Sequence, residues 1–288
     1  MNVRSVLEPT RRTRNSGARQ LAHRDLAQVL QVLDTDPVAS CMVAARLQEH
    51  GLDGRGGGEL WSRGGPVESL CFSGANLMPL RGGPDDLRAF AERAARWPRT
   101  CSSVVGRQEL ALPLWERLAD RWGPARELRA DQPLLALDGP AYAVADARVR
   151  RVRVDELDRY LVAAVAMFTE EIGVDPRIGD GGRSYRRRVA GLIQAGRAWA
   201  RFEDGEVVYK AEVGAVSRRT GQIQGVWVHP RCRGRGLGTS GTAAVANAVV
   251  ASGRTASLYV NCYNDAARRA YANVGFRQIA TFATVLVD

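Results

Sequence analysis

A glycine-rich loop with two arginines is the segment of this chain best suited to chemistry. The segment VWVHPRCRGRGLG, residues 226–238, begins as an apolar strand pattern and continues into the loop. An alanine- and valine-rich helical pattern follows at once. Glycines let backbone N–H groups close on an anion, and the start of the next helix adds the positive end of its dipole. The segment therefore predicts a site for the phosphate groups of a ligand.

Two common phosphate-binding motifs do not fit this loop. A P-loop carries a lysine after its last glycine, whereas the only lysine in the chain is Lys210. A dinucleotide site needs G-x-G-x-x-G and an acid about 20 residues on. Here Gly234, Gly236 and Gly238 form G-x-G-x-G, and TSGTAAVANAVVASGRT follows without an acid. The spacing disfavours both a nucleoside triphosphatase and a dinucleotide-binding fold.

Two motifs in sequence order resemble those of a known superfamily. Residues 233–238, RGRGLG, match R-x-x-G-x-G, and residues 264–276 match N-x-x-A-x-x-x-Y-x-x-x-G-F. An apolar strand pattern at residues 257–260 lies between them. In these features the chain resembles the GNAT superfamily of acyl-CoA-dependent N-acyltransferases. The resemblance implies acetyl-CoA, or another acyl-CoA, as co-substrate, and no metal.

The resemblance also implies a fold class. We expect an α/β (α+β) GNAT fold, with a central mixed, mostly antiparallel sheet flanked by helices. Residues 146–288 follow the GNAT order of elements and are expected to form the acyltransferase domain. Residues 20–145 lack the R-x-x-G-x-G motif but show a parallel outline, so we interpret them as a second, degenerate GNAT-like domain in tandem. Residues 1–19 read as a flexible basic arm.

Local patterns place the individual elements. Helical patterns cover 25–51, 84–97, 112–123, 155–174 and 184–196. Strand patterns cover 59–62, 67–74, 132–138, 148–154, 197–203, 206–217, 222–228 and 282–288.

The resemblance assigns residues to the acyl-CoA site. The strand before the loop is expected to bind pantetheine through its backbone, with the N–H of Val228 polarising the thioester carbonyl. Amides of the loop and its two arginines are expected to bind the pyrophosphate. The predicted cofactor-binding residues are Val226, Trp227, Val228, Arg233, Gly234, Arg235, Gly236, Leu237, Gly238, Thr239, Asn261 and Asn264.

Tyr271 is the predicted catalytic residue. Asn264 precedes a helical run and has the side chain of a helix N-cap. Tyr271 lies seven residues on, about two turns, and so shares a face with Asn264. In the family this tyrosine protonates the leaving thiolate, which suits a phenol of pKa about 10. The alternative is a core tyrosine that packs on Phe276.

The general base is not evident from the sequence. Many family members carry a glutamate on the strand before the loop, where this chain has Gln222. Glu212, Glu170 and Glu171 could act through water or hold a cationic substrate, although each could equally be a surface carboxylate. His229 could titrate near neutrality, but a histidine beside a turn is more often structural. We therefore assign no base.

Composition limits the remaining possibilities. At 288 residues the chain is long enough for about two domains. It has no apolar run of about 20 residues and no signal-peptide core, so a cytoplasmic protein without a membrane partner is expected. The five cysteines include no C-x-x-C pair, which disfavours a disulfide framework and a zinc site. The net charge of +10 reflects arginines spread over the chain, so a nucleic-acid partner is not expected.

These observations lead to an N-acyltransferase that uses direct attack of an amine within a ternary complex. A covalent route through Cys262 is less favoured, because no histidine accompanies it in the local pattern. Two further alternatives are a non-catalytic acyl-CoA sensor and an interaction module built on the basic arm. The acceptor, a small-molecule or protein amine, is not identified, although Glu170, Glu171 and Asp175 suggest a cationic one. The sequence does not indicate an oligomeric state.

Overall fold

The computed structural model describes residues 17–52 and 58–288. The predicted basic arm, residues 1–19, thus lies almost wholly outside the described residues. The N-terminal half contains β1 (Arg19–Gln20), α1 (Leu26–Leu33), α2 (Cys41–His50), β2 (Glu59–Ser62), β3 (Leu70–Ser73), β4 (Leu77–Arg81), α3 (Pro84–Ala94), β5 (Ser103–Arg107), α4 (Gln108–Glu116), α5 (Ala119–Trp122) and β6 (Glu127–Leu137).

The C-terminal half repeats this alternation of helices and strands. It contains β7 (Arg150–Arg151), α6 (Leu157–Ile172), α7 (Arg183–Gln194), β8 (Ala198–Glu203), β9 (Glu206–Val216), β10 (Thr220–Val228), α8 (Leu237–Ala251), β11 (Thr255–Tyr259), α9 (Asp265–Val274) and β12 (Arg277–Leu286).

All these strands form one sheet, in the order β1-β2-β3-β4-β5-β12-β6-β11-β10-β9-β8-β7. The pairs β4–β5 and β10–β11 are parallel, and the other described pairs are antiparallel. The predicted mixed, mostly antiparallel sheet is therefore confirmed. The two halves of this order correspond strand by strand: β1 matches β7, β2 matches β8, and so on to β6, which matches β12. Exchanging each strand with its match reverses the order and leaves it otherwise unchanged. This internal symmetry is the arrangement expected of two tandem halves.

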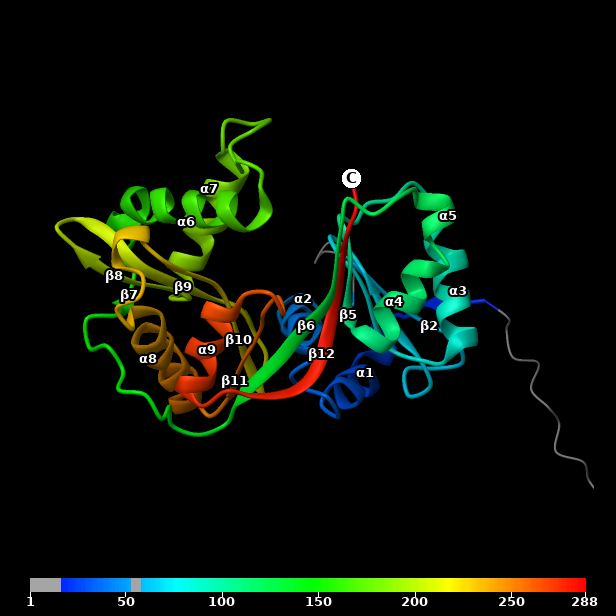
Figure 1. Ribbon diagram of the computed structural model, residues 1–288. Coiled ribbons are helices and arrows are strands. Elements are labelled where there is room, and N and C mark those ends of the chain that lie inside the picture. The colour runs from blue at the N-terminus through cyan, green and yellow to red at the C-terminus, as the bar shows by residue number, and fades with distance from the viewer. Residues whose placement is uncertain (1–16, 53–57) are drawn as a thin grey trace, which may run out of the picture.

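Each half completes its sheet with the last strand of the other half. The strand β6 pairs with β11, for example Ala136 with Ser257, and β12 pairs with β5, for example Thr284 with Val105. Figure 1 shows β6 and β12 running side by side through the middle of the molecule. The sheet thus crosses the predicted boundary between residues 145 and 146 without a break, and the boundary itself stays a prediction.

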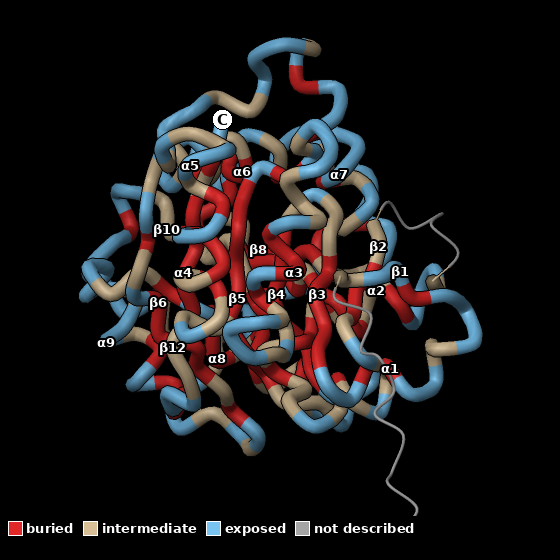
Figure 2. Tube along the Cα trace, turned by 90° about the vertical axis from the view of Figure 1, so that its right-hand side faces the viewer, coloured by how far each residue is buried: buried red, intermediate tan, exposed pale blue. Residues whose placement is uncertain are grey.

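Helices cover both faces of the sheet in each half (Figure 1). Apolar side chains of α1 and α2 fill one core region of the N-terminal half, and those of α3 and α4 fill another. In the C-terminal half, α6 and α7 cover one face and α8 and α9 the other. Figure 2 shows the buried segments gathered along the strands between these helical layers. The strands are therefore held from both sides, as a rigid support for a site at their ends.

The structure corrects two of the expected elements. The helical pattern at 25–51 is broken into α1 and α2. Pro37 disfavours helical geometry at Asp36, the residue before it, and this explains the break. The strand pattern at 148–154 yields only the short edge strand β7, since the chain turns into a helical segment from Val154.

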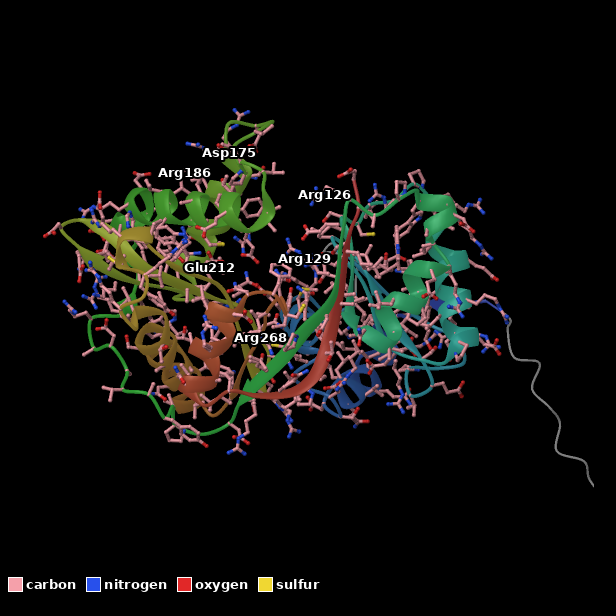
Figure 3. The ribbon with its side chains drawn as sticks, in the orientation of Figure 1. Arg126, Arg129, Asp175, Arg186, Glu212 and Arg268 are labelled. Atoms are coloured by element: carbon pink, nitrogen blue, oxygen red, sulfur yellow. The ribbon has the colours of Figure 1, made fainter. Side chains whose placement is uncertain are left out.

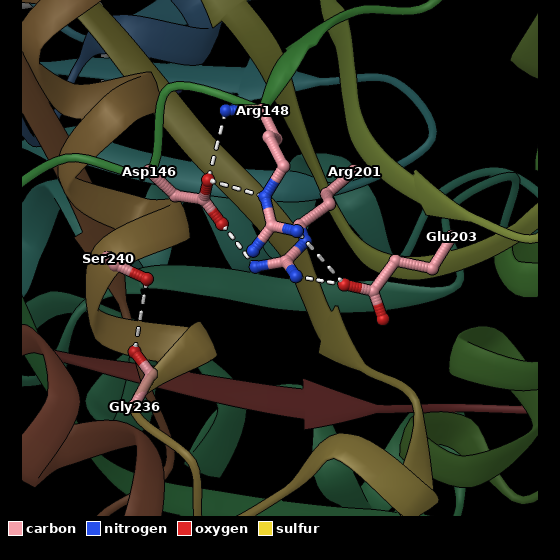
Figure 4. Close-up of polar contacts among 6 residues, drawn as sticks. All are labelled: Asp146, Arg148, Arg201, Glu203, Gly236 and Ser240. Atoms are coloured by element: carbon pink, nitrogen blue, oxygen red, sulfur yellow. Dashed lines mark hydrogen bonds and ion pairs between the residues drawn. The ribbon is translucent and has the colours of Figure 1, made fainter.

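The connection between the halves is fastened to the C-terminal half. The Ala141 N–H donates to Asn247 Oδ1 at 2.8 Å, and the Asp146 N–H donates to the Ser240 carbonyl at 3.0 Å. The Asp146 carboxylate also accepts a hydrogen bond from Arg201 at 2.7 Å (Figure 4). Because Ser240 lies in the first turn of α8, these bonds steady the start of the helix that follows the glycine-rich loop.

Candidate functional site

The strands β10 and β11 separate where the predicted site begins. They pair in parallel only from Thr220 to Gln222. Beyond this point β10 bulges against β9 between Gln224 and Trp227, and Gly225 within the bulge has a φ of +56°. An added Cβ at Gly225 would lie 3.1 Å from Lys210 Nζ, so the bulge favours glycine on both counts. The bend carries β10 away from β11 and opens the sheet.

A cavity of about 450 Å³ lies at this opening. Its size is within the usual range of small-molecule sites. The C-terminal half contributes residues of α6, β10, β11 and α9, and the N-terminal half contributes residues near α2, β4, β5 and β6. The polar side chains in its wall are Asn76, Ser103, Arg129, Gln132, Glu170, Glu171, Gln222, Gln224, Tyr259, Asn261, Tyr263, Asn264, Tyr271 and Thr284.

The backbone of β10 presents polar groups on its side away from β9. The His229 N–H donates to the Val208 carbonyl of β9 at 3.0 Å. Since successive residues alternate their direction along a strand, the N–H group of Val228 points the other way. The Val228 carbonyl, on that side, accepts from Arg233 Nε at 3.0 Å. The Val228 N–H is therefore directed as polarisation of a carbonyl would require, and its role stays a prediction.

The glycine-rich loop forms an open cradle at the start of α8. Gly234 and Gly236 have φ of +73° and +77°, and no atom lies within 4 Å of an added Cβ at either. The first hydrogen bond of α8 runs from the Ser240 N–H to the carbonyl of Gly236, the N-cap residue, at 3.0 Å. The N–H groups of Leu237, Gly238 and Thr239 precede that bond and are therefore the free donors of the first turn. This cradle fits the pyrophosphate of an acyl-CoA.

The two loop arginines differ in their partners. Arg233 bonds both carboxylate oxygens of Glu170, at 2.8 and 2.7 Å. Arg235 is exposed and has no partner among the described residues. Arg235 is thus the loop cation free to meet a phosphate, while Arg233 also ties the loop to α6. Trp227 joins the same contact, because its Nε1 donates to Glu170 at 3.1 Å.

The two predicted asparagines have different surroundings. Asn264 caps α9, as expected, because its Oδ1 accepts from the Ala267 N–H at 3.1 Å. Asn261 accepts from Gln132 Nε2 at 2.7 Å and donates to the Tyr263 hydroxyl at 2.8 Å. Asn261 therefore already joins the segment after β11 to β6, and a contact with acyl-CoA would have to be shared with these bonds.

Tyr271 lies in the cavity wall together with Asn264, as a shared helix face requires. Its ring is also edge-on to Phe276, with centroids 6.2 Å apart. Tyr271 therefore also packs on Phe276, which was the alternative interpretation of this residue. Its hydroxyl has no hydrogen-bond partner in the described part of the chain. Burial raises the pKa of Tyr271 well above its ordinary value. The phenol is therefore protonated at neutral pH and able to donate.

The three acids named as possible bases have different partners in the structure. Glu170 is engaged with Trp227 and Arg233, and Glu212 is buried with Lys210. Glu171 lines the cavity and keeps contact with solvent, yet the protein around it raises its carboxyl pKa. A carboxylate with a raised pKa in a cleft is suited to accept a proton near neutral pH.

His229 and Gln222 take structural positions. The His229 side chain accepts from the Arg231 N–H at 3.3 Å, and its ring meets the edge of Trp227. Gln222 is 7% exposed and lines the cavity, where an amide can orient a ligand but cannot act as a base.

A buried ion pair lies behind the bulge. Lys210 Nζ donates to Glu212 Oε1 at 2.9 Å, and Arg188 Nη2 donates to Glu212 Oε2 at 3.1 Å. Burial opposes the charge of Glu212, but Lys210 and Arg188 outweigh it and hold the pKa of Glu212 below its ordinary value. Gln224, which lines the cavity, also bonds this carboxylate. The pair thus supports the cavity wall from behind.

We expect Lys210→Met to lower the free energy of unfolding by about 3 kcal/mol, because it leaves the Glu212 charge buried with fewer partners. The measurement is urea unfolding with comparison of midpoints and slopes. The double variant Lys210→Met with Glu212→Leu removes both charges and should recover part of the loss. A single variant as stable as the wild type would show that the pair does not support the fold.

The N-terminal half has a counterpart of the cradle that is filled by its own side chain. The internal symmetry places α3, which begins at Pro84 after the sequence RGG, where α8 lies in the other half. Asp86 Oδ2 accepts from the Gly83 N–H at 2.9 Å, and Arg63 pairs with the same carboxylate. An added Cβ at Gly82 would lie 2.8 Å from Asp86 Cβ. A carboxylate therefore occupies the position at which the C-terminal half is open.

It follows that one chain should bind one acyl-CoA. We expect calorimetric titration with acetyl-CoA to give a stoichiometry near one per chain. A stoichiometry of two would show that Asp86 does not close the N-terminal position.

Two family models match parts of the chain. Residues 58–160 match the Domain of unknown function (DUF4081), and residues 207–286 match the FR47-like protein family. The second match contains the bulge, the cradle and Tyr271.

Solved structures of similar fold cover nearly the whole chain. A Drosophila protein is 14% identical with a TM-score of 0.68, covering 95% of this chain and 99% of its own. A GNAT-family acetyltransferase from Colwellia psychrerythraea is 11% identical with a TM-score of 0.57, covering 94% and 99%. A tandem GNAT protein from the clavulanic acid biosynthesis pathway is 14% identical with a TM-score of 0.56, covering 93% and 98%. At these identities the likeness concerns the fold.

One curated relative matches a smaller part. The granaticin polyketide synthase bifunctional cyclase/dehydratase of Streptomyces violaceoruber is 30% identical over 121 residues. The match covers 42% of this chain and 34% of that protein, so the chain spans about a third of its length.

No helix within residues 17–52 and 58–288 is long and apolar enough to cross a membrane. The same residues contain no group of three His, Cys, Asp or Glu side chains placed to hold a metal ion.

Proposed function

We propose that this protein, a member of the GNAT superfamily by its fold and by the FR47-like match of residues 207–286, transfers an acyl group from acyl-CoA to an amine. The observation that supports the proposal is the separation of β10 from β11 at a cavity that Tyr271 lines, with an open anion cradle directly after β10. Acetyl-CoA is the proposed donor, and the amine attacks it directly within a ternary complex. Amine-dependent release of free CoA from acetyl-CoA tests this function.

The chain's own residues supply each part of the reaction. The N–H groups of the cradle and Arg235 bind the pyrophosphate. The Val228 N–H donates to the thioester oxygen as charge develops on it. Tyr271 gives its proton to the thiolate as the carbon–sulfur bond breaks. Glu171 takes the proton that the attacking nitrogen loses as the new carbon–nitrogen bond forms.

Glu171 is the proposed base because it combines position and pKa. It lies at the end of α6 in the cavity wall, and its carboxyl pKa is raised by the surrounding protein. Gln222, at the position where family members carry a glutamate, cannot take the proton. The proposal therefore moves the base from β10 to α6, across the same cavity.

We expect Glu171→Gln to lower kcat/KM for the amine by about 100-fold, the scale of general base catalysis. In the wild type, kcat/KM should rise with pH as the Glu171 carboxyl loses its proton, at a pH above the ordinary range of a glutamate. That acidic limb should be absent in the variant. The measurement is CoA release as a function of pH, with the acetyl-CoA dissociation constant as a check on the fold.

The matched control is Glu170→Gln, which changes the neighbouring acid of the same helix. Glu170 holds Arg233 and Trp227, so this change should weaken acetyl-CoA binding and leave the acidic limb in place. An acidic limb that persists in Glu171→Gln and disappears in Glu170→Gln would overturn the assignment.

A further inference from the structure

The wall that the N-terminal half contributes to the cavity carries a cation. Arg129 lines the cavity and lies on β6, the strand of the N-terminal half that pairs with β11 of the C-terminal half. Its side chain is 8% exposed. Figure 3 shows Arg129 between the two halves of the molecule, with Glu212 in the half across from it. The guanidinium is thus placed where a ligand in the cavity would meet it.

The guanidinium is held in a fixed orientation. Its Nε and Nη2 donate to the two carboxylate oxygens of Glu127 at 2.7 and 3.1 Å, and Nη2 also donates to the Glu171 carbonyl at 3.2 Å. A guanidinium has five N–H donors in one plane, of which these bonds use three. No described residue accepts a hydrogen bond from Nη1. The fork with Glu127 therefore fixes the group and leaves its Nη1 edge for a ligand.

The cation lies beside the proposed base. Arg129 touches the backbone of Glu171, whose carboxylate lines the same cavity. The Arg129 guanidinium can donate to an oxyanion, and the Glu171 carboxylate can accept from an amine. The guanidinium contacts the backbone of the same residue that carries this carboxylate. Asn76 adds an amide to the same wall, where its Oδ1 accepts from Ser103. Opposite charges at this spacing suit a small molecule that carries an amine and a carboxylate.

We propose that the acceptor is a primary amine bearing a carboxylate close to its nitrogen, such as a free amino acid, and that Arg129 selects it by binding the carboxylate through Nη1. The inference rests on the proposed acyl transfer and adds the substrate class to it. The N-terminal half then has a defined part in the reaction, because it supplies the residue that recognises the acceptor.

The test uses matched amines that differ only in the carboxylate. The pairs are alanine and ethylamine, phenylalanine and 2-phenylethylamine, and tryptophan and tryptamine, each offered with acetyl-CoA to the full chain. In at least one pair we expect the carboxylate-bearing member to have kcat/KM at least about tenfold higher, mainly through KM, which is the scale of a hydrogen bond to a charged group. Arg129→Gln should remove this preference while acetyl-CoA binds as before.

The control is Arg126→Gln, which removes an exposed arginine next to β6 that pairs with Asp288 outside the cavity. This variant should keep the preference. Equal use of both members of every pair by the wild type, or a preference that survives in Arg129→Gln, would overturn the inference and leave acyl transfer standing. Acetyl-CoA binding with no acylation of any of these amines would overturn the inference, and loss of acetyl-CoA binding itself would instead remove the proposed function. If Arg129→Gln fails to fold, the wild-type comparison of the pairs decides.

Discussion

Gly236→Glu is expected to weaken acetyl-CoA binding by at least about 100-fold, or about 2.7 kcal/mol. Gly236 is the N-cap of α8, and its open surroundings leave room for a new side chain beside the cradle. The added carboxylate would compete for the N–H groups of the first turn and repel the pyrophosphate. Calorimetric titration with acetyl-CoA measures the effect.

The matched control for this change is Gly253→Glu. Gly253 has the same φ of +77° and equally open surroundings, but it lies just beyond the other end of α8. Its substitution therefore introduces the same backbone strain and the same charge away from the cradle. We expect Gly253→Glu to bind acetyl-CoA like the wild type. Equal loss in both variants would attribute the effect to strain in α8, and retained binding in Gly236→Glu would contradict the cradle.

Tyr271→Phe is expected to lower kcat by about 100- to 1000-fold with little change in the KM for acetyl-CoA. The substitution keeps the ring and its edge contact with Phe276 and removes only the proton donor. Because burial holds the pKa of Tyr271 above its ordinary value, the wild type should keep kcat at pH values up to about 10. Steady-state CoA release at saturating amine measures both effects.

The control for the tyrosine is Tyr259→Phe. Tyr259 lies on β11 in the same cavity wall, and its ring packs against Phe282. We expect this variant to keep kcat within about threefold of the wild type, since Tyr259 has no assigned proton transfer. A large loss of kcat in Tyr259→Phe with none in Tyr271→Phe would show that the assignment of Tyr271 as the acid is wrong.

Local patterns predicted the parts of the site that are local in the chain. The loop from Arg233 to Gly238 and the cap and tyrosine of α9 depend on residues a few positions apart, and the structure places Asn264 and Tyr271 in the cavity wall and the loop between β10 and α8. The N-cap of Asn264 follows from its own side chain and the next turn. Such features are determined by short-range geometry, and the sequence is therefore informative about them.

The exchange of β6 and β12 could not be predicted in this way. Both strands have ordinary apolar patterns, and no local signal states which half an apolar strand will join. The role that we propose for Arg129, binding of the acceptor's carboxylate, was missed for the same reason. The only available signal is the polar first half of β6, with Glu127, Arg129, Asp131 and Gln132 before the apolar residues 134–137. Their meaning depends on the cavity that the exchange creates.

Besides the two-residue strand β1, the strands β4 and β5 of the N-terminal half were also missed. The strand β4 carries Pro79, which weakens a strand pattern, and β5 is short and ends in Gly106 and Arg107. Their pairing is supported mainly by long-range neighbours: β5 lies against β12, from the far end of the chain. Tertiary pairing here outweighs local preference.

The central claim is transfer of an acyl group to an amine, and its most direct test is identification of the products. Purified wild-type protein is incubated with acetyl-CoA and the matched amines, and free CoA and acylated amine are quantified by mass spectrometry. The account predicts equal amounts of free CoA and acetylated amine, with both lost in Tyr271→Phe. Acetyl-CoA that binds but yields no acetylated amine would contradict the account and favour a non-catalytic acyl-CoA sensor.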